Sequence, residues 1–206
     1  MKKRRSIFHA IAIGLLSTSL AAFAQEPKAT VGQPAPEFSL TSVGGESVAL
    51  ADFRGSYVVL EWTNYDCPFV RKFYNVGAMQ ALQRELAEKN VVWLSICSSA
   101  PGKQGHFTPE EWAKRIEEWK VAAKAVLLDP DGKVGRAYGA TNTPHMFVIN
   151  PEGVIIYAGA IDDKPSANSK DIDGATNYVR AALEAAWEGK PVAVPSTKAY
   201  GCTVKY

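Results

Sequence analysis

Cys67 is the residue of this sequence best placed to do chemistry. It follows an apolar run (YVVL) and a polar turn, and it stands directly before Pro68. Because proline is favoured in the first turn of a helix, this order predicts a strand, a turn and a helix that begins at Cys67. A helix N-terminus stabilises an anion, so a thiol there ionises readily and becomes a nucleophile. Arg71 and Lys72 would favour the thiolate further and Asp66 would oppose it, whereas the alternative is a small buried cysteine with no reactivity.

The other two cysteines are candidates for a second thiol. A lone nucleophile that is oxidised to a sulfenic acid needs another thiol with which to condense. Cys202 lies in an irregular tail that could span about 36 Å from Pro191, more than the radius of gyration of about 16 Å for a domain of this size. A terminal cysteine that packs under the domain edge, or that pairs with another molecule, is the alternative. Cys97 ends the apolar run LSIC, which indicates a core thiol, although a resolving role stays open.

The elements that must position these thiols alternate between strands and helices. Apolar runs and alternation predict strands at 37–40, 47–50, 57–62, 91–97, 125–128, 145–149 and 154–158. Helical spacing predicts helices from 68 to about 89, from a capping box at 108–111, over 134–138 and over 174–189. The order predicts an α/β fold with a central mixed β-sheet flanked by helices.

Composition and charge set the broad class of the chain. With 206 residues, 47% of them hydrophobic, and a net charge of +2, it fits one globular domain plus extensions, and nothing in it favours a nucleic-acid partner. Residues 1–24 combine KKRR, an apolar run and an Ala-Phe-Ala site, which predicts a signal peptide and a periplasmic protein. The apolar run is shorter than the roughly 20 residues of a membrane span, so we expect no membrane association after cleavage. The predicted division is a domain at 25–189 and an extended tail at 190–206.

At this point the sequence resembles the thioredoxin-like superfamily and, within it, the redoxin branch, which is the alkyl hydroperoxide reductase and thiol-specific antioxidant group with its peroxiredoxin-like proteins. The resemblance covers about residues 31–189 and is carried by APEFSL, the strand into DCP, LLDPDGKVGRAYGA and TPHMFVINPEG; the tail YGCTVKY resembles the ending of a peroxiredoxin-like subgroup. It implies a thioredoxin-like fold with an N-terminal hairpin extension. It also implies that Thr143-Pro144 forms a cis-proline loop that faces Cys67 and offers the Thr143 backbone to a bound thiol or peptide.

Two departures from the family patterns bear on the chemistry. Val70 stands where the Cys-x-x-Cys motif of the dithiol branch has its second cysteine, so this chain has no resolving thiol within the motif. The peroxiredoxin pattern is Pro-x-x-x-Thr/Ser-x-x-Cys. Here Leu60 stands at the position of the proline and Asn64 at the position of the threonine or serine, with Thr63 one residue away. The arginine that peroxiredoxins place near the peroxide has no clear match in this sequence. Asn64 can still hydrogen-bond a peroxide or a thiolate.

The candidate substrate-binding residues are Thr63, Asn64, Thr143, Pro144 and His145. His145 could stabilise the thiolate or shuttle its proton, although a strand-end histidine with satisfied hydrogen bonds is commoner. Cys67 and His145 alone are too few ligands for a metal, so no metal and no cofactor is expected.

The function that we predict is an exported, peroxiredoxin-like thiol oxidoreductase. Cys67 would attack a peroxide or a disulfide, Cys202 would resolve the product, and an external thiol reductant would restore the enzyme. A disulfide reductase or isomerase, a non-enzymatic binding module and a metal chaperone that use the same groove are the alternatives. The sequence separates neither the two substrates nor the two possible resolving thiols, Cys202 and Cys97.

Overall fold

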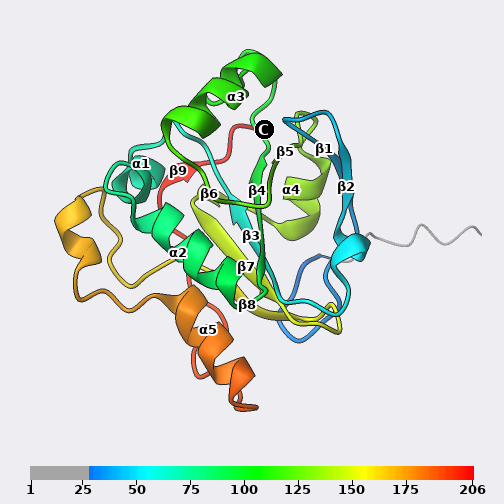
Figure 1. Ribbon diagram of the computed structural model, residues 1–206, viewed down its shortest axis with the longest axis vertical. Coiled ribbons are helices and arrows are strands. Elements are labelled where there is room, and N and C mark those ends of the chain that lie inside the picture. Colours follow the sequence, from blue (N-terminus) through cyan, green and yellow to red (C-terminus); the bar gives the residue numbers. More distant parts are fainter. Residues whose placement is uncertain (1–27) are drawn as a thin grey trace, which may run out of the picture.

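The computed structural model describes residues 28–206, so the predicted signal peptide lies outside the described residues. The described chain forms a seven-stranded mixed sheet in the order β2-β1-β5-β4-β3-β7-β8, with a separate β6–β9 pair (Figure 1). β3, β4 and β5 run parallel, whereas β7 is antiparallel to β3 and β1 is antiparallel to β5. The predicted α/β class with a mixed sheet is confirmed. The strands are β1 Ser39–Ser42, β2 Ser47–Ala49, β3 Val58–Trp62, β4 Val92–Cys97, β5 Ala125–Leu128, β6 Asn142–Thr143, β7 His145–Ile149, β8 Ile155–Gly159 and β9 Cys202–Thr203.

Helices cover both faces of the sheet. The α-helices are α1 Pro68–Tyr74, α2 Ala78–Glu88, α3 Pro109–Glu118, α4 Lys133–Tyr138 and α5 Tyr178–Trp187, and the 3-10 turns are η1 Leu50–Phe53 and η2 Ser169–Ile172. Figure 1 shows α2 and α5 in front of the sheet and α4 behind it. No helix within residues 28–206 is long and apolar enough to cross a membrane.

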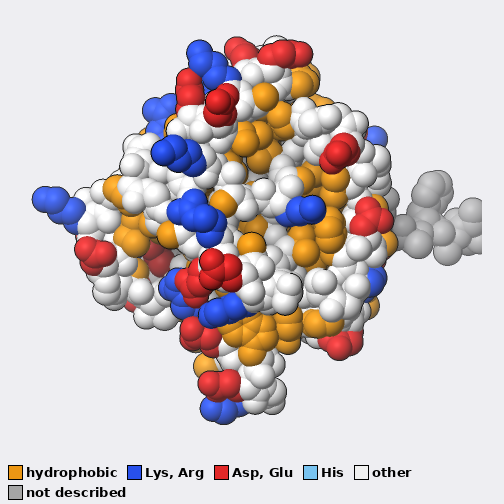
Figure 2. Space-filling view, viewed as in Figure 1, with side chains coloured by type: hydrophobic (Ala, Val, Ile, Leu, Met, Phe, Trp, Pro, Cys, Tyr) orange, Lys and Arg blue, Asp and Glu red, His pale blue; other side chains and the backbone are white. Residues whose placement is uncertain are grey.

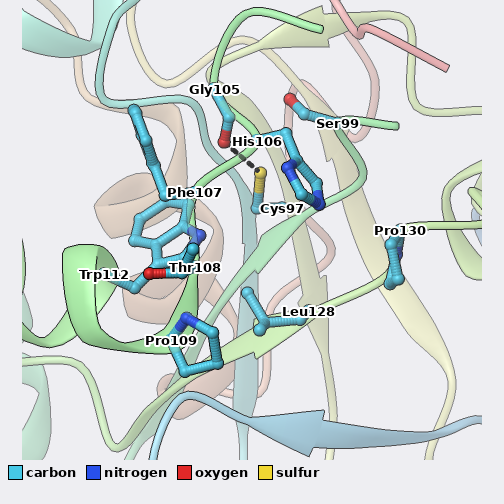
Figure 3. A pocket seen from close by; sticks show the side chains of 10 residues that line it. All are labelled: Cys97, Ser99, Gly105, His106, Phe107, Thr108, Pro109, Trp112, Leu128 and Pro130. Atoms are coloured by element: carbon cyan, nitrogen blue, oxygen red, sulfur yellow. Dashed lines mark hydrogen bonds between the residues drawn. The ribbon is translucent and has the colours of Figure 1, made fainter. Parts of the chain in front are cut away.

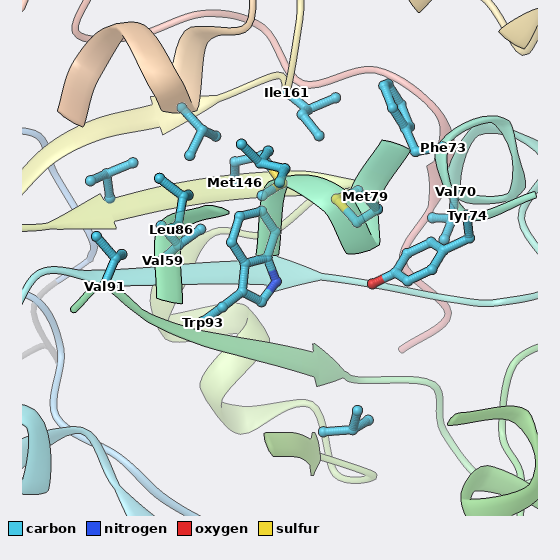
Figure 4. Close-up of a cluster of buried hydrophobic side chains, with 14 of the residues drawn as sticks. Val59, Val70, Phe73, Tyr74, Met79, Leu86, Val91, Trp93, Met146 and Ile161 are labelled. Carbon is cyan, nitrogen blue, oxygen red and sulfur yellow. The ribbon is translucent and has the colours of Figure 1, made fainter. Parts of the chain in front are cut away.

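The central strand β3 is buried along its whole length, as expected of an apolar strand with neighbours on both sides. Alternation sends Val59 into the core under α2 and α5, where Trp93 and Met146 also lie (Figure 4). Val58 and Leu60 point to the opposite face and pack in a second core with Tyr138 of α4. The residues at the carboxyl end of β3 are therefore held by packing from two sides.

The helix that was expected to continue to residue 89 is two helices. α1 ends at Tyr74, and Gly77, the N-cap of α2, has φ 77°, a left-handed conformation that a continuous helix does not contain. The last helix also begins later than expected, at Tyr178, where the Asn177 side chain accepts the N–H of Arg180. The capping box of α3 is confirmed, because Thr108 and Glu111 each accept the backbone N–H of the other.

The tail has more structure than its sequence indicates. After α5 it returns across the molecule and β9 pairs antiparallel with β6. Further along, the Ala100 N–H donates to the carbonyl of Lys205 at 2.8 Å, and the Tyr206 hydroxyl donates to the carbonyl of Ala140 at 2.7 Å. The face of the molecule in Figure 2 carries acidic and basic side chains interspersed rather than segregated.

Candidate active site

Cys67 is the N-cap of α1, with Pro68 at the first helical position, as the sequence predicts. Its backbone N–H donates to the carbonyl of Asn64 at 2.9 Å. The Asn64 side chain accepts the N–H of Asp66 at 2.9 Å and donates to the carbonyl of Gln104 at 3.2 Å. Asn64 therefore shapes the turn that presents Cys67.

Three segments from distant parts of the chain meet at the Cys67 sulfur. The thiol donates to the carbonyl of Thr143 at 3.2 Å, and the expected cis peptide between Thr143 and Pro144 is confirmed. In the β6–β9 pair, Cys202 stands opposite Thr143. Both cysteines are free thiols. The structure thus brings together Cys67, Thr143, Pro144 and Cys202, four of the residues singled out from the sequence.

The two neighbouring thiols have opposite acidities. Burial raises the pKa of Cys67, but hydrogen bonds from the side chains of Cys202 and Thr143 and from the backbone of Cys202 and Val70 outweigh it and hold that pKa below its usual value. Burial, together with the hydrogen bond and charge of Cys67, raises the pKa of Cys202 to about 12. Cys67 is therefore the more acidic of the two thiols and the one that ionises first.

The basic residues of α1 do not have the role expected of them. Arg71 donates to the carbonyl of Tyr65 at 2.8 Å and pairs with Asp66 at 3.2 Å. The Lys72 ammonium is buried and pairs with Asp162. The pKa of Cys67 is lowered by local hydrogen bonds rather than by these two cations.

Replacing Cys202 with alanine should raise the pKa of Cys67, because the variant loses the thiol that donates to the Cys67 thiolate. Titration of the ultraviolet thiolate absorbance would show the first midpoint at higher pH than in the wild type. Cys97→Ala is the matched control and should leave that midpoint in place. An unchanged midpoint in Cys202→Ala would contradict the arrangement.

His145 is not placed to stabilise the thiolate by charge. Its ring stacks on Phe147 with centroids 4.6 Å apart, and its Nδ1 accepts the N–H of Thr141 at 3.3 Å. Burial lowers its pKa to about 4, so the imidazole is neutral near pH 7. Thr63 is buried one residue beyond β3, where its N–H donates to the carbonyl of Ile96 at 2.9 Å.

Cys97 lies in a separate cavity of about 260 Å³ beside α3 (Figure 3). Its thiol donates to the carbonyl of Gly105 at 3.4 Å, and burial raises its pKa. The walls are mainly apolar and include Phe107, Trp112 and Leu128. Of the two candidate second thiols, Cys202 is the one placed opposite Thr143, whose carbonyl accepts from Cys67.

Two polar networks behind the site were not predicted. The buried Glu61 carboxylate accepts hydrogen bonds at 2.9 Å from Tyr74, Trp93 and Ser95. Figure 4 shows the Tyr74 hydroxyl pointing toward β3. A glutamate inside the apolar run YVVLEW was a signal for this network. The second network joins Lys72, Asp162 and Tyr200, and no spacing in the sequence points to it.

Comparison with known proteins agrees with this architecture. The model of the AhpC/TSA family matches residues 31–158. The thiol-disulfide oxidoreductase ResA of Bacillus cereus (strain ATCC 10987 / NRS 248) is 25% identical over 76% of this chain and 88% of its own. The thiol:disulfide interchange protein DsbE of Pseudomonas fluorescens biotype C is 29% identical over 68% of this chain and 73% of its own. Peroxiredoxin tpx1 of Schizosaccharomyces pombe is 29% identical over 68% of this chain and 76% of its own.

Solved structures show the same fold. An uncharacterized conserved protein from Geobacillus kaustophilus superposes with a TM-score of 0.73 at 27% identity, over 89% of this chain and 94% of that protein. The thioredoxin domain of a thiol-disulfide oxidoreductase from Bacteroides vulgatus superposes with a TM-score of 0.51 at 24% identity, over 70% of this chain and 96% of that domain. The expected thioredoxin-like fold is confirmed, and the chain belongs to the AhpC/TSA family.

Proposed function

We propose that this protein is an exported thiol-dependent oxidoreductase in which Cys67 is the nucleophile and Cys202 is the second thiol. The observation that carries the proposal is the β6–β9 pairing, which sets Cys202 opposite Thr143, the residue whose carbonyl contacts Cys67. Membership of the AhpC/TSA family and the thiol-disulfide oxidoreductases among the relatives support the same class of reaction.

The reaction with a disulfide proceeds in two exchanges. The Cys67 thiolate attacks one sulfur, the substrate S–S bond breaks, and the released thiolate takes up a proton. Cys202 then loses its proton and attacks the Cys67 sulfur, which releases the second substrate thiol and leaves a Cys67–Cys202 disulfide. The substrate gains two electrons and two protons, and an external thiol reductant returns the protein to the dithiol state.

The acidities of the two thiols suit this order of events. Part of the rise in the pKa of Cys202 comes from the Cys67 thiolate beside it. Once Cys67 is in a mixed disulfide it carries no charge, so that part disappears and Cys202 ionises more readily. Cys202 therefore stays protonated while Cys67 is the nucleophile and becomes a better nucleophile when its own step begins.

A peroxide is the second candidate substrate, favoured by the family match and by the peroxiredoxin relative. The Cys67 thiolate would attack one peroxide oxygen, and the O–O bond would break to release an alcohol or water and leave a sulfenic acid on Cys67. Cys202 would then condense with the sulfenic acid to give the same disulfide and a water molecule. Disulfide exchange is the better supported of the two, because the Asn64 side chain is engaged in the turn and in the contact with Gln104. Leu60 also replaces the proline of the peroxiredoxin pattern.

Export remains part of the proposal because of residues 1–24, whose basic tip, apolar run and Ala-Phe-Ala site form a signal peptide pattern. The mature protein would then consist of the domain at 25–189 and the tail at 190–206. The periplasm is the compartment that we propose, since disulfides form and persist there.

Mapping the sulfurs of the oxidised protein tests the assignment. The reduced protein is treated in parallel with hydrogen peroxide and with a small aliphatic disulfide, and is then digested and examined by mass spectrometry. We expect one linkage, Cys67–Cys202, with Cys97 recovered as a free thiol. The faster of the two oxidants identifies the substrate class, and a Cys67–Cys97 linkage would overturn the role of Cys202.

A further inference from the structure

Three consecutive tail residues, Tyr200–Cys202, cross the active site, and we call them the strap. The Tyr200 ring meets Phe69 edge to face, with centroids 6.0 Å apart. Gly201 has φ 118°, and a Cβ there would overlap the Thr143 carbonyl and press on Phe69. The strap thus lies between the first turn of α1 and the cis-proline loop. Beneath it Cys67 is 0% exposed, so no oxidant reaches its sulfur while the strap is closed.

The strap is held at one end by a buried ion pair. The Tyr200 hydroxyl donates to Asp162 at 2.5 Å. The Lys72 ammonium lies 3.4 Å from the other Asp162 oxygen, 3.4 Å from the Tyr200 hydroxyl and 2.9 Å from the carbonyl of Lys164. The side chains of Lys72 and Asp162 are 0% and 2% exposed. A buried pair of this kind is stable only when its remaining hydrogen-bonding positions are filled, and the Tyr200 hydroxyl fills one of them.

We propose that Tyr200, hydrogen-bonded to the Lys72–Asp162 pair, is a positioning residue that latches the strap over Cys67. Release of the strap then gates the reaction of Cys67, and closure of the strap returns Cys202 to the Cys67 sulfur. The inference rests on the proposed function only in taking Cys67 as the reacting thiol. Lys72 and Asp162 belong to α1 and to the loop after β8, so the latch fastens the tail to the body of the domain.

Release of the strap would expose an edge of β6 as well as the Cys67 sulfur. The strap and the residues after it occupy the free edge of β6, where Val204 N–H donates to the carbonyl of Thr141 and the Asn142 side chain donates to the carbonyl of Gly201. An extended peptide can add to a free strand edge. A polypeptide disulfide must therefore displace the strap from β6, whereas a small disulfide needs only a transient opening.

Alkylation of Cys67 in Tyr200→Phe tests the latch independently of redox chemistry. The full-length reduced protein is treated with iodoacetamide, and modification of Cys67 is followed by peptide mass. Loss of a hydrogen bond to a charged group should raise the open fraction of the strap and therefore the alkylation rate about tenfold. Tyr138→Phe is the matched control, because its hydroxyl bonds the carbonyl of Pro36 on the opposite face of the sheet. It should change the rate less than about twofold.

A second readout separates positioning from general loosening. The equilibrium between the Cys67–Cys202 disulfide and glutathione measures the effective concentration of the Cys202 thiol at Cys67. Tyr200→Phe should lower this effective concentration about tenfold, because the strap no longer holds Cys202 in place. Hydrogen exchange at the tail amides should accelerate in the same variant while exchange in β3 and β4 stays unchanged.

Each outcome of these measurements decides the proposal. Equal alkylation rates in Tyr200→Phe and wild type, or an equal rise in Tyr200→Phe and Tyr138→Phe, would overturn the latch. If alkylation of Cys67 and hydrogen exchange of the tail change as expected but no variant reacts with peroxide or disulfide, the latch stands and the proposed function fails.

Discussion

The Cys67→Ser variant should reduce a small disulfide more slowly than the wild type by three orders of magnitude or more, on the order of what removal of a nucleophile costs in other enzymes. A serine hydroxyl stays protonated at pH 7 and forms no disulfide, so neither exchange step can occur. The hydrogen bonds that hold the pKa of Cys67 below its usual value have no effect on a group that does not ionise. Steady-state rates with a small aliphatic disulfide and an excess of thiol reductant would measure the loss.

Cys97→Ser is the matched control for this experiment, because it makes the same chemical change at a thiol in the separate cavity. It should keep nearly full activity. Cys202→Ser should give an intermediate result, in which the first exchange survives and a mixed disulfide accumulates on Cys67. Wild-type rates in Cys67→Ser would exclude redox chemistry at this sulfur and would favour a binding module that uses the same groove.

Glu61→Ala should lower the free energy of unfolding by about 3–5 kcal/mol. The variant leaves the donors of Tyr74, Trp93 and Ser95 buried without the carboxylate that accepts them, and each buried unsatisfied donor costs about 1–3 kcal/mol. Denaturant-induced unfolding followed by tryptophan fluorescence would measure the change. A loss below about 1 kcal/mol would mean that water or repacking satisfies the three donors.

The same carboxyl group makes stability depend on pH. Burial raises the pKa of Glu61 above 4.5, against the hydrogen bonds from Trp93, Ser95 and Tyr74. The folded protein therefore keeps this proton where the unfolded chain has lost it. This contribution to stability is complete below pH 4.5 and is lost as the pH rises through the folded-state pKa. Glu61→Gln, which cannot ionise, should flatten that part of the profile relative to wild type.

The sequence was informative wherever a local rule governs the structure. Pro68 after Cys67 predicted where α1 starts, and the capping box at 108–111 predicted where α3 starts. Both follow from backbone hydrogen bonding within a few residues. The break at Gly77 was underestimated because a single glycine inside a helical pattern is often tolerated.

The parts that could not be predicted depend on contacts between distant segments. β6 and β9 have two residues each, too few for any alternation to be read. Lys72 was interpreted as a cation near the thiolate because one turn of helix separates them, yet its partner Asp162 is 90 positions away. The length of the tail made Cys202 a candidate, but only the fold shows that Cys202 lies opposite Thr143 at the Cys67 site.

The break at Gly77 also has a mechanical consequence. It makes α1 a short helix of its own, which packs in the same core as α2 through Val70 and Phe73. Cys67 stands at the start of α1 and Lys72 five residues further, a rise of about 7.5 Å along the axis. The N-cap thiol and the ammonium that pairs with Asp162 are therefore carried by one short helix, so a change in the orientation of α1 would displace both groups together.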